Sequence, residues 1–124
     1  RILKDMIEQA EQEIKDCEEI LLANEVTPAP GLPARPEVKL EDIPVGARFA
    51  DAEIAAALAA DNAASLVVCS QNIGMSIRED IGMMFTKFHA AKLAIGAKIL
   101  RMNKEKGWLI PPPLRVHRPE LVNA

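Results

Sequence analysis

Four ionisable side chains could be combined into a metal centre: Glu8, Glu11, Asp61 and His89. Helical bundles that hold two metal ions use carboxylates together with a Glu-x-x-His pair on each of two helices, because residues three apart share a face. No Asp or Glu in this sequence precedes a histidine by three positions. The sequence therefore predicts no metal and no other cofactor. A metal-binding or oxidoreductase function stays open as the alternative.

Lys92 and the two cysteines are the other reactive side chains in apolar surroundings. We expect Lys92 at the edge of a helical bundle, with its ammonium group reaching water, rather than as a buried functional amine. Cys17 and Cys69 fall in apolar patterns of separate helices, which favours free, buried thiols over a disulfide. No glycine-rich phosphate loop, Cys-x-x-Cys pair or Ser-His-Asp arrangement is recognisable. The sequence therefore favours a protein without enzymatic activity.

A long amphipathic helix over residues 76–106 would position Lys92. Ser76 and Glu79 match the Ser-x-x-Glu capping box, which predicts that this helix begins at Ser76. Apolar residues then recur at steps of three and four, as one stripe of a helix requires. These residues are Ile77, Ile81, Met84, Phe88, Ala91, Ile95, Ile99 and Met102.

The end of this helix has its own signal. Gly107 can adopt a positive φ angle, which would turn Trp108 back onto the last turn near Met102. Three consecutive prolines prevent continuation of the helix. Residues 107–124 are therefore expected to form an extended arm, an interpretation that we prefer to a polyproline ligand.

Two further helices are expected, over residues 1–24 and 51–73. The first has an apolar stripe at helical spacing, made of Leu3, Ile7, Ala10, Ile14, Cys17 and Leu21. The second is rich in alanine, has Asp51 as its expected cap and should end at Gly74. The proline-rich stretch 25–50 between them is long enough to run the length of a bundle and join two parallel helices. The short turn before Ser76 makes the last two helices antiparallel.

Composition excludes several classes of protein. The chain has 124 residues, enough for one domain, with 49% hydrophobic and only 3% aromatic residues. A net charge of -3 with interleaved signs gives no basic surface for nucleic acid. No run of apolar residues approaches the roughly 18 that a membrane span needs, so no membrane partner is expected. Free thiols fit the cytoplasm.

Several stretches resemble a family of ferritin-like bundles of unknown function from spore-forming, Bacillus-type bacteria, distant relatives of spore coat protein F. They are EILLANEVTPAPGLPARP, the 51–73 helix, IREDIGMMFTKF and, most specifically, KEKGWLIPPP with Gly107 and Trp108. The resemblance implies an all-α, ferritin-like, up-down bundle with one long crossover, whose first helix is missing from this chain. It implies a fold and a possible spore association but no activity.

The face of the 76–106 helix opposite its core stripe is also apolar, where an outer helix would carry charge. It consists of Gly82, Met83, Ala90, Leu93, Ala94, Ala97 and Leu100. We expect a homodimer with this face at the interface. The alternative is that residues 27–50, or the tail after Pro113, cover it. A structural or interaction role follows, with a small apolar ligand between the helices as a further alternative.

Overall fold

The computed structural model describes residues 1–113, which form three α-helices, two single-turn 3-10 helices and no strand. The α-helices are α1 (Ile2–Ala23), α2 (Asp51–Met75) and α3 (Glu79–Glu105). The 3-10 turns η1 (Leu40–Asp42) and η2 (Val45–Ala47) lie in the connection before α2. The all-helical class predicted from the sequence is confirmed for the described residues.

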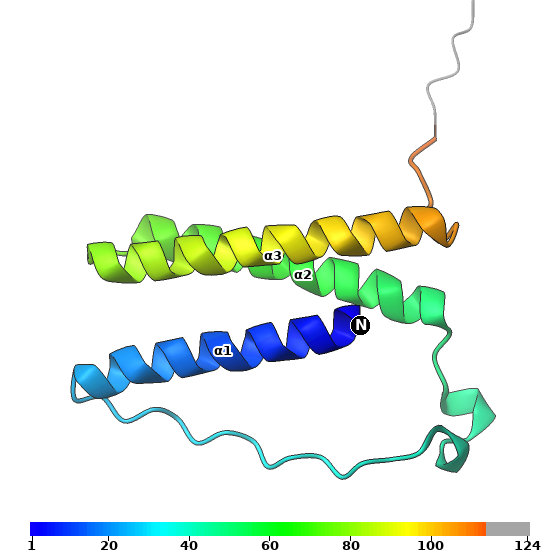
Figure 1. Cartoon of the computed structure of the whole chain (residues 1–124), viewed down its shortest axis with the longest axis horizontal. Coiled ribbons are helices and arrows are strands. Elements are labelled where there is room, and N and C mark those ends of the chain that lie inside the picture. The colour runs from blue at the N-terminus through cyan, green and yellow to red at the C-terminus, as the bar shows by residue number, and fades with distance from the viewer. Residues whose placement is uncertain (114–124) are drawn as a thin grey trace, which may run out of the picture.

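The long connection runs back along the whole length of α1, so that α1 and α2 point the same way and α3 runs antiparallel to both (Figure 1). Helix α3 packs along α2 and also contacts α1, whereas α1 and α2 do not pack on each other. The three helices therefore occupy three corners of a bundle, with α3 between the other two. The parallel pair and the antiparallel pair match the expectation from loop lengths.

The predicted capping box of α3 is wrong. Ser76 is instead the C-cap of α2, where its hydroxyl donates to the carbonyl oxygen of Asn72. Arg78 is extended and precedes α3 as its N-cap without a side-chain capping bond, and Glu79 is the first helical residue. Because Arg78 is the N-cap, Ser76 lies two residues before the cap position, and its hydroxyl oxygen accepts no amide of the first turn of α3.

The start and the end of α2 also differ from the expectation. The N-cap is Ala50, not Asp51, and the Glu53 carboxylate accepts a hydrogen bond of 2.8 Å from the Ala50 amide. This bond is one half of a capping box, since alanine has no side-chain acceptor. The helix passes through Gly74 and ends at Met75, because Ser76 supplies the closing hydrogen bonds.

At the end of α3, Gly107 has φ +69°. The amide of Trp108 donates to the carbonyl of Asn103 at 2.9 Å, and that of Gly107 to Lys104 at 3.2 Å. This is the Schellman arrangement that terminates helices at glycine. The Trp108 side chain is half-buried, and so is Met102. The part of the expected arm beyond Pro113, with His117, lies outside the described residues.

The core is small and lies between α2 and α3. Its buried apolar residues are Ala55, Cys69, Phe88, Ile95 and Ile99, and α1 contributes none. The chain exposes 10654 Å², whereas a compact monomer of its mass would expose about 6,500 Å². Apolar side chains of the helices are among the exposed ones, for example Ile14 of α1, Val67 of α2 and Met83 of α3.

The expectation that no segment is apolar enough to span a membrane is wrong by length and composition. The segment Val45–Met75 passes that test, and little of its most apolar part is buried. Asp61 is the only charged residue between Glu53 and Arg78, and many of the other residues there are alanines. A helix that is apolar on all sides requires neighbours on more than one side.

Alanine substitutions at two glycines, Gly96 and Gly74, should have opposite effects on stability. A Cβ atom added at Gly96 would lie 2.8 Å from Nδ2 of Asn62, a buried side chain that donates to the Lys92 carbonyl at 3.1 Å. Gly96→Ala should break this bond and destabilise the protein by about 1–3 kcal/mol, less the gain in helix propensity. Gly74→Ala meets open space and should stabilise it by about 0.5–1 kcal/mol. Urea unfolding of both variants checks this, and a stabilised Gly96→Ala would contradict the close α2–α3 contact.

Candidate functional site: an open groove between the helices

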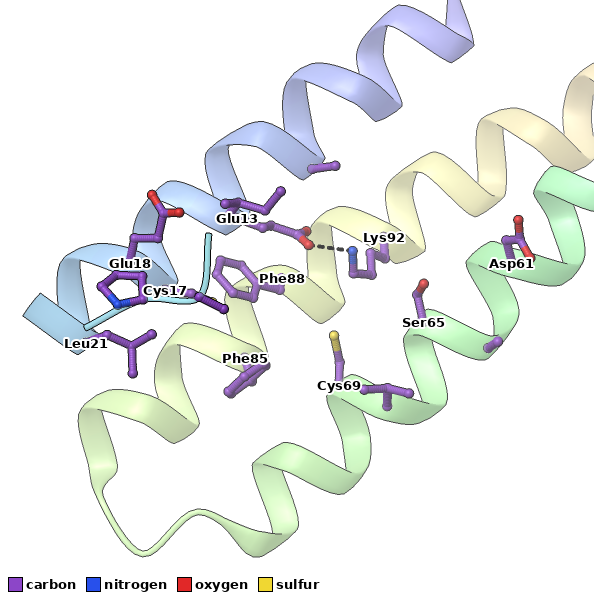
Figure 2. A pocket seen from close by; sticks show the side chains of 16 residues that line it. Glu13, Cys17, Glu18, Leu21, Asp61, Ser65, Cys69, Phe85, Phe88 and Lys92 are labelled. Carbon is purple, nitrogen blue, oxygen red and sulfur yellow. Dashed lines mark hydrogen bonds and ion pairs between the residues drawn. The ribbon is translucent and has the colours of Figure 1, made fainter. Parts of the chain in front are cut away.

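A groove of about 690 Å³ lies between α1 and the α2–α3 pair, and we call it the open groove (Figure 2). Side chains of α1 form one wall, those of α2 the other, and α3 lies at the floor. Pro28 and Ala29 of the connection close one end. Most of the lining is apolar, and includes Leu21, Val68 and Phe88. A smaller cavity of about 150 Å³ shares Ala10, Asp61, Ser65 and Lys92 with it and extends it to Met6.

One ion pair lies at the floor of the open groove. The ammonium of Lys92 donates to the Glu13 carboxylate at 2.6 Å, and the two side chains are 18% and 17% exposed. Lys92 therefore matches neither prediction fully. Its side chain is mostly buried, unlike a lysine at the edge of a bundle that reaches water, but its charge is paired, unlike that of a free functional amine. Glu13 was missed by sequence reasoning because it belongs to a polar stripe of α1, and only the contact with α3 distinguishes it from its acidic neighbours.

Both cysteines line the open groove, Cys17 from α1 and Cys69 from α2. Both thiols are free, as the sequence predicted. Burial raises the pKa of Cys17, and the nearby carboxylates of Glu13 and Asp16 raise it further. Burial also raises the pKa of Cys69, against the opposing charge of Lys92. The thiols are therefore protonated at neutral pH and are poor nucleophiles.

The apolar stripe predicted for α1 lines the open side of the molecule instead of a core. Leu3, Ile7, Ile14 and Leu21 are 50%, 56%, 58% and 37% exposed. The side of α1 that turns toward α3 includes Gln9 and Glu13, which are partly buried and hydrogen-bonded to each other at 2.8 Å. The most apolar face of α1 thus has no covering element in the described part of the chain.

The candidate metal ligands are not brought together. Asp61 lines the open groove, but Glu8, Glu11 and His89 do not. Glu8 and Glu11 are exposed on α1, and His89 is half-buried on α3. Within residues 1–113, no three His, Cys, Asp or Glu side chains are grouped closely enough to hold a metal ion.

A second groove of about 450 Å³ lies between α2 and α3, and we call it the outer groove. Leu93, Ala97 and Leu100 of the expected interface line it, opposite Ala63 and Leu66 of α2. The long connection does not line it, so residues 27–50 do not cover this part of the face. The remaining expected interface residues, which do not line the outer groove, are Gly82, Met83, Ala90 and Ala94.

One buried polar atom borders the outer groove without a partner. Asn103 is a buried residue of α3, and its Oδ1 accepts no hydrogen bond in the described structure. Nothing in the sequence marks this asparagine, since asparagines in the last turn of a helix are common near surfaces.

Comparison with known proteins gives the family. The model of a family described as a protein of unknown function (DUF3231) matches residues 1–121. The chain belongs to this family. A relative in Bacillus subtilis (strain 168), the uncharacterized protein YvdQ, is 52% identical over 118 residues, which cover 95% of this chain and 69% of that protein.

A solved structure is also similar. The crystal structure of a candidate spore coat protein from Bacillus halodurans C-125 has a TM-score of 0.86 and 51% sequence identity to this DUF3231 chain. The similarity covers 92% of this chain and 72% of the crystallised one. Both relatives are therefore longer than the region that they share with this chain.

Proposed function

We propose that this DUF3231 protein is a non-enzymatic structural or interaction protein whose helices pack against other helices. The observation that carries this proposal is the apolar stripe of α1, which is up to 58% exposed, together with the exposed outer face of α3. Contiguous exposed apolar surface of this kind indicates an interaction site. The protonated thiols and the scattered carboxylates offer little to a catalytic alternative.

We further propose that the chain is part of a ferritin-like bundle. Support comes from the order of its elements: two parallel helices joined by a connection that runs their whole length, then an antiparallel third helix. That order fits the last three helices of a four-helix bundle with one long crossover. In this proposal α2 packs inside the bundle, where Asn62 is buried and donates to the Lys92 carbonyl of α3.

The spore coat description of the Bacillus halodurans relative supports an association with spores. Free cysteines support synthesis in a reducing compartment such as the cytoplasm. A fluorescent fusion expressed in sporulating Bacillus subtilis should become enriched at the developing spore. Fluorescence that stays uniform in the mother cell through spore release would contradict the association.

Elemental analysis separates the structural role from the metal-dependent alternative. Purified protein should retain no stoichiometric metal after dialysis. Iron, manganese or zinc at one or two equivalents would overturn the non-enzymatic proposal.

A homodimer through the outer face of α3 is the simplest partnership. Met83 and Leu93 are exposed there, and small residues such as Ala90 and Ala97 allow close approach of two helices. Ala90→Glu with Ala97→Glu should make the protein monomeric in light scattering while it stays helical. Ala34→Glu, in the exposed connection, is the matched control. A wild-type protein that is monomeric at high micromolar concentration would contradict the dimer.

A further inference from the structure

The apolar stripe of α1 is longer than the cavity beside it. From Leu3 to Leu21 it spans 19 residues, or about 27 Å of helix. The open groove covers only the part from Ala10 to Leu21, with an extension to Met6. A small apolar ligand in the groove would therefore leave Leu3 and Ile7 exposed. An element that covers the whole stripe must be elongated and parallel to α1.

The arrangement of the three helices defines the space for that element. Helix α3 contacts both α1 and α2, but α1 and α2 do not pack on each other, and the open groove lies between them. A fourth element there would touch both. Four helices around one core are the arrangement in which each helix has two neighbours.

The charges of the open groove specify its occupant further. Four ionisable side chains other than thiols line it: Glu13, Glu18, Asp61 and Lys92. Lys92 is paired with Glu13, while Glu18 and Asp61 form no ion pair within the described residues. The groove therefore has a surplus of negative charge. A basic side chain on the occupant would be attracted, and an acidic ligand would be repelled.

We infer that the open groove is the docking site of an amphipathic helix that carries an apolar stripe for α1 and α2 and a Lys or Arg opposite Asp61. The chain spans 69% of the Bacillus subtilis relative and 72% of the Bacillus halodurans chain. The unmatched residues of those relatives are a source of suitable length. The inference rests on the proposed packing function, but it uses a surface distinct from the outer face of α3.

The test uses the 124-residue chain and overlapping synthetic peptides that cover the unmatched residues of the Bacillus subtilis relative. One peptide should bind and become helical by circular dichroism, with an affinity measured by calorimetry. Ile14→Glu and Asp61→Lys should each weaken its binding about tenfold or more, through an apolar loss and a like-charge contact respectively. Leu32→Glu, in the exposed connection, should leave binding unchanged. Replacing the basic residue of the peptide by Glu should restore its binding to the Asp61→Lys variant.

The inference would be overturned if no peptide binds, or if neither Ile14→Glu nor Asp61→Lys changes the affinity of the peptide that does. A small apolar compound that occupies the groove and excludes the peptides, seen by native mass spectrometry, would favour the ligand alternative. Self-association lost in Ile14→Glu would show that a second copy fills the groove. Loss of dimerisation through Ala90 and Ala97 would overturn only the proposed dimer, since those residues do not line the open groove.

Discussion

Phe88→Ala should lower the free energy of unfolding by about 3–5 kcal/mol, as truncation of a buried aromatic side chain does. Phe88 is 5% exposed, lies at the floor of the open groove and meets the ring of Phe85 edge-on, with 5.7 Å between ring centroids. It is the only buried aromatic residue in the described structure, so few other contacts can compensate for its loss. The midpoint of urea unfolding, followed by circular dichroism, measures the effect.

Phe49→Ala is the matched control, since Phe49 is 76% exposed in the connection before α2. Its effect should stay within about 0.5 kcal/mol. If Phe88→Ala does not fold, Phe88→Leu keeps most of the buried apolar surface and should lose less stability. Equal effects at positions 88 and 49 would mean that the described core does not hold the helices together.

Glu13→Ala should destabilise the protein by about 1.5–3 kcal/mol, because it leaves the ammonium of Lys92 mostly buried and without its acceptor. Among residues 1–113, three side-chain polar contacts join α1 and its C-cap to α3 and its N-cap: Asp5 with Lys98, Glu13 with Lys92, and Asn24 with Arg78. Only the Glu13–Lys92 pair is mostly buried, so α1 should lose its protection from hydrogen exchange first. Urea unfolding and hydrogen exchange of the α1 amides measure both effects.

Two variants sharpen this test. Glu11→Ala changes an exposed carboxylate on the same helix and should have an effect below about 0.5 kcal/mol. The double variant Glu13→Leu with Lys92→Met replaces the pair by apolar side chains and should be near neutral or stabilising. A Glu13→Ala variant as stable as Glu11→Ala would contradict a structural role for the ion pair.

The sequence alone predicted the helices because their signals are local. The 3.6-residue spacing of apolar residues, the density of alanine and the five prolines of the connection act within one segment. Gly107 likewise ends α3 through its own backbone freedom and the bonds made by the next residues. Ser76 shows where local reasoning fails: the Ser-x-x-Glu pattern predicts a helix start there, but α3 begins at Glu79, and the Ser76 hydroxyl donates to the end of α2.

The residues of the open groove depended on contacts between helices. Glu13 has acidic neighbours on α1 that look the same in the sequence, and only its position opposite Lys92 makes it different. The sequence did identify the apolar stripe of α1, but it could not reveal that this stripe faces the open side. Periodicity shows that a helix has an apolar face, whereas the element that covers this face is fixed by packing among segments far apart in the chain. The sequence by itself thus determined three helices, the end of the last helix at Gly107, and the directions of all three. Only the tertiary structure decided which side of α1 contacts α3 and which remains free. Either the side with Glu13 or the apolar stripe could face α3, and the structure places the Glu13–Lys92 ion pair there.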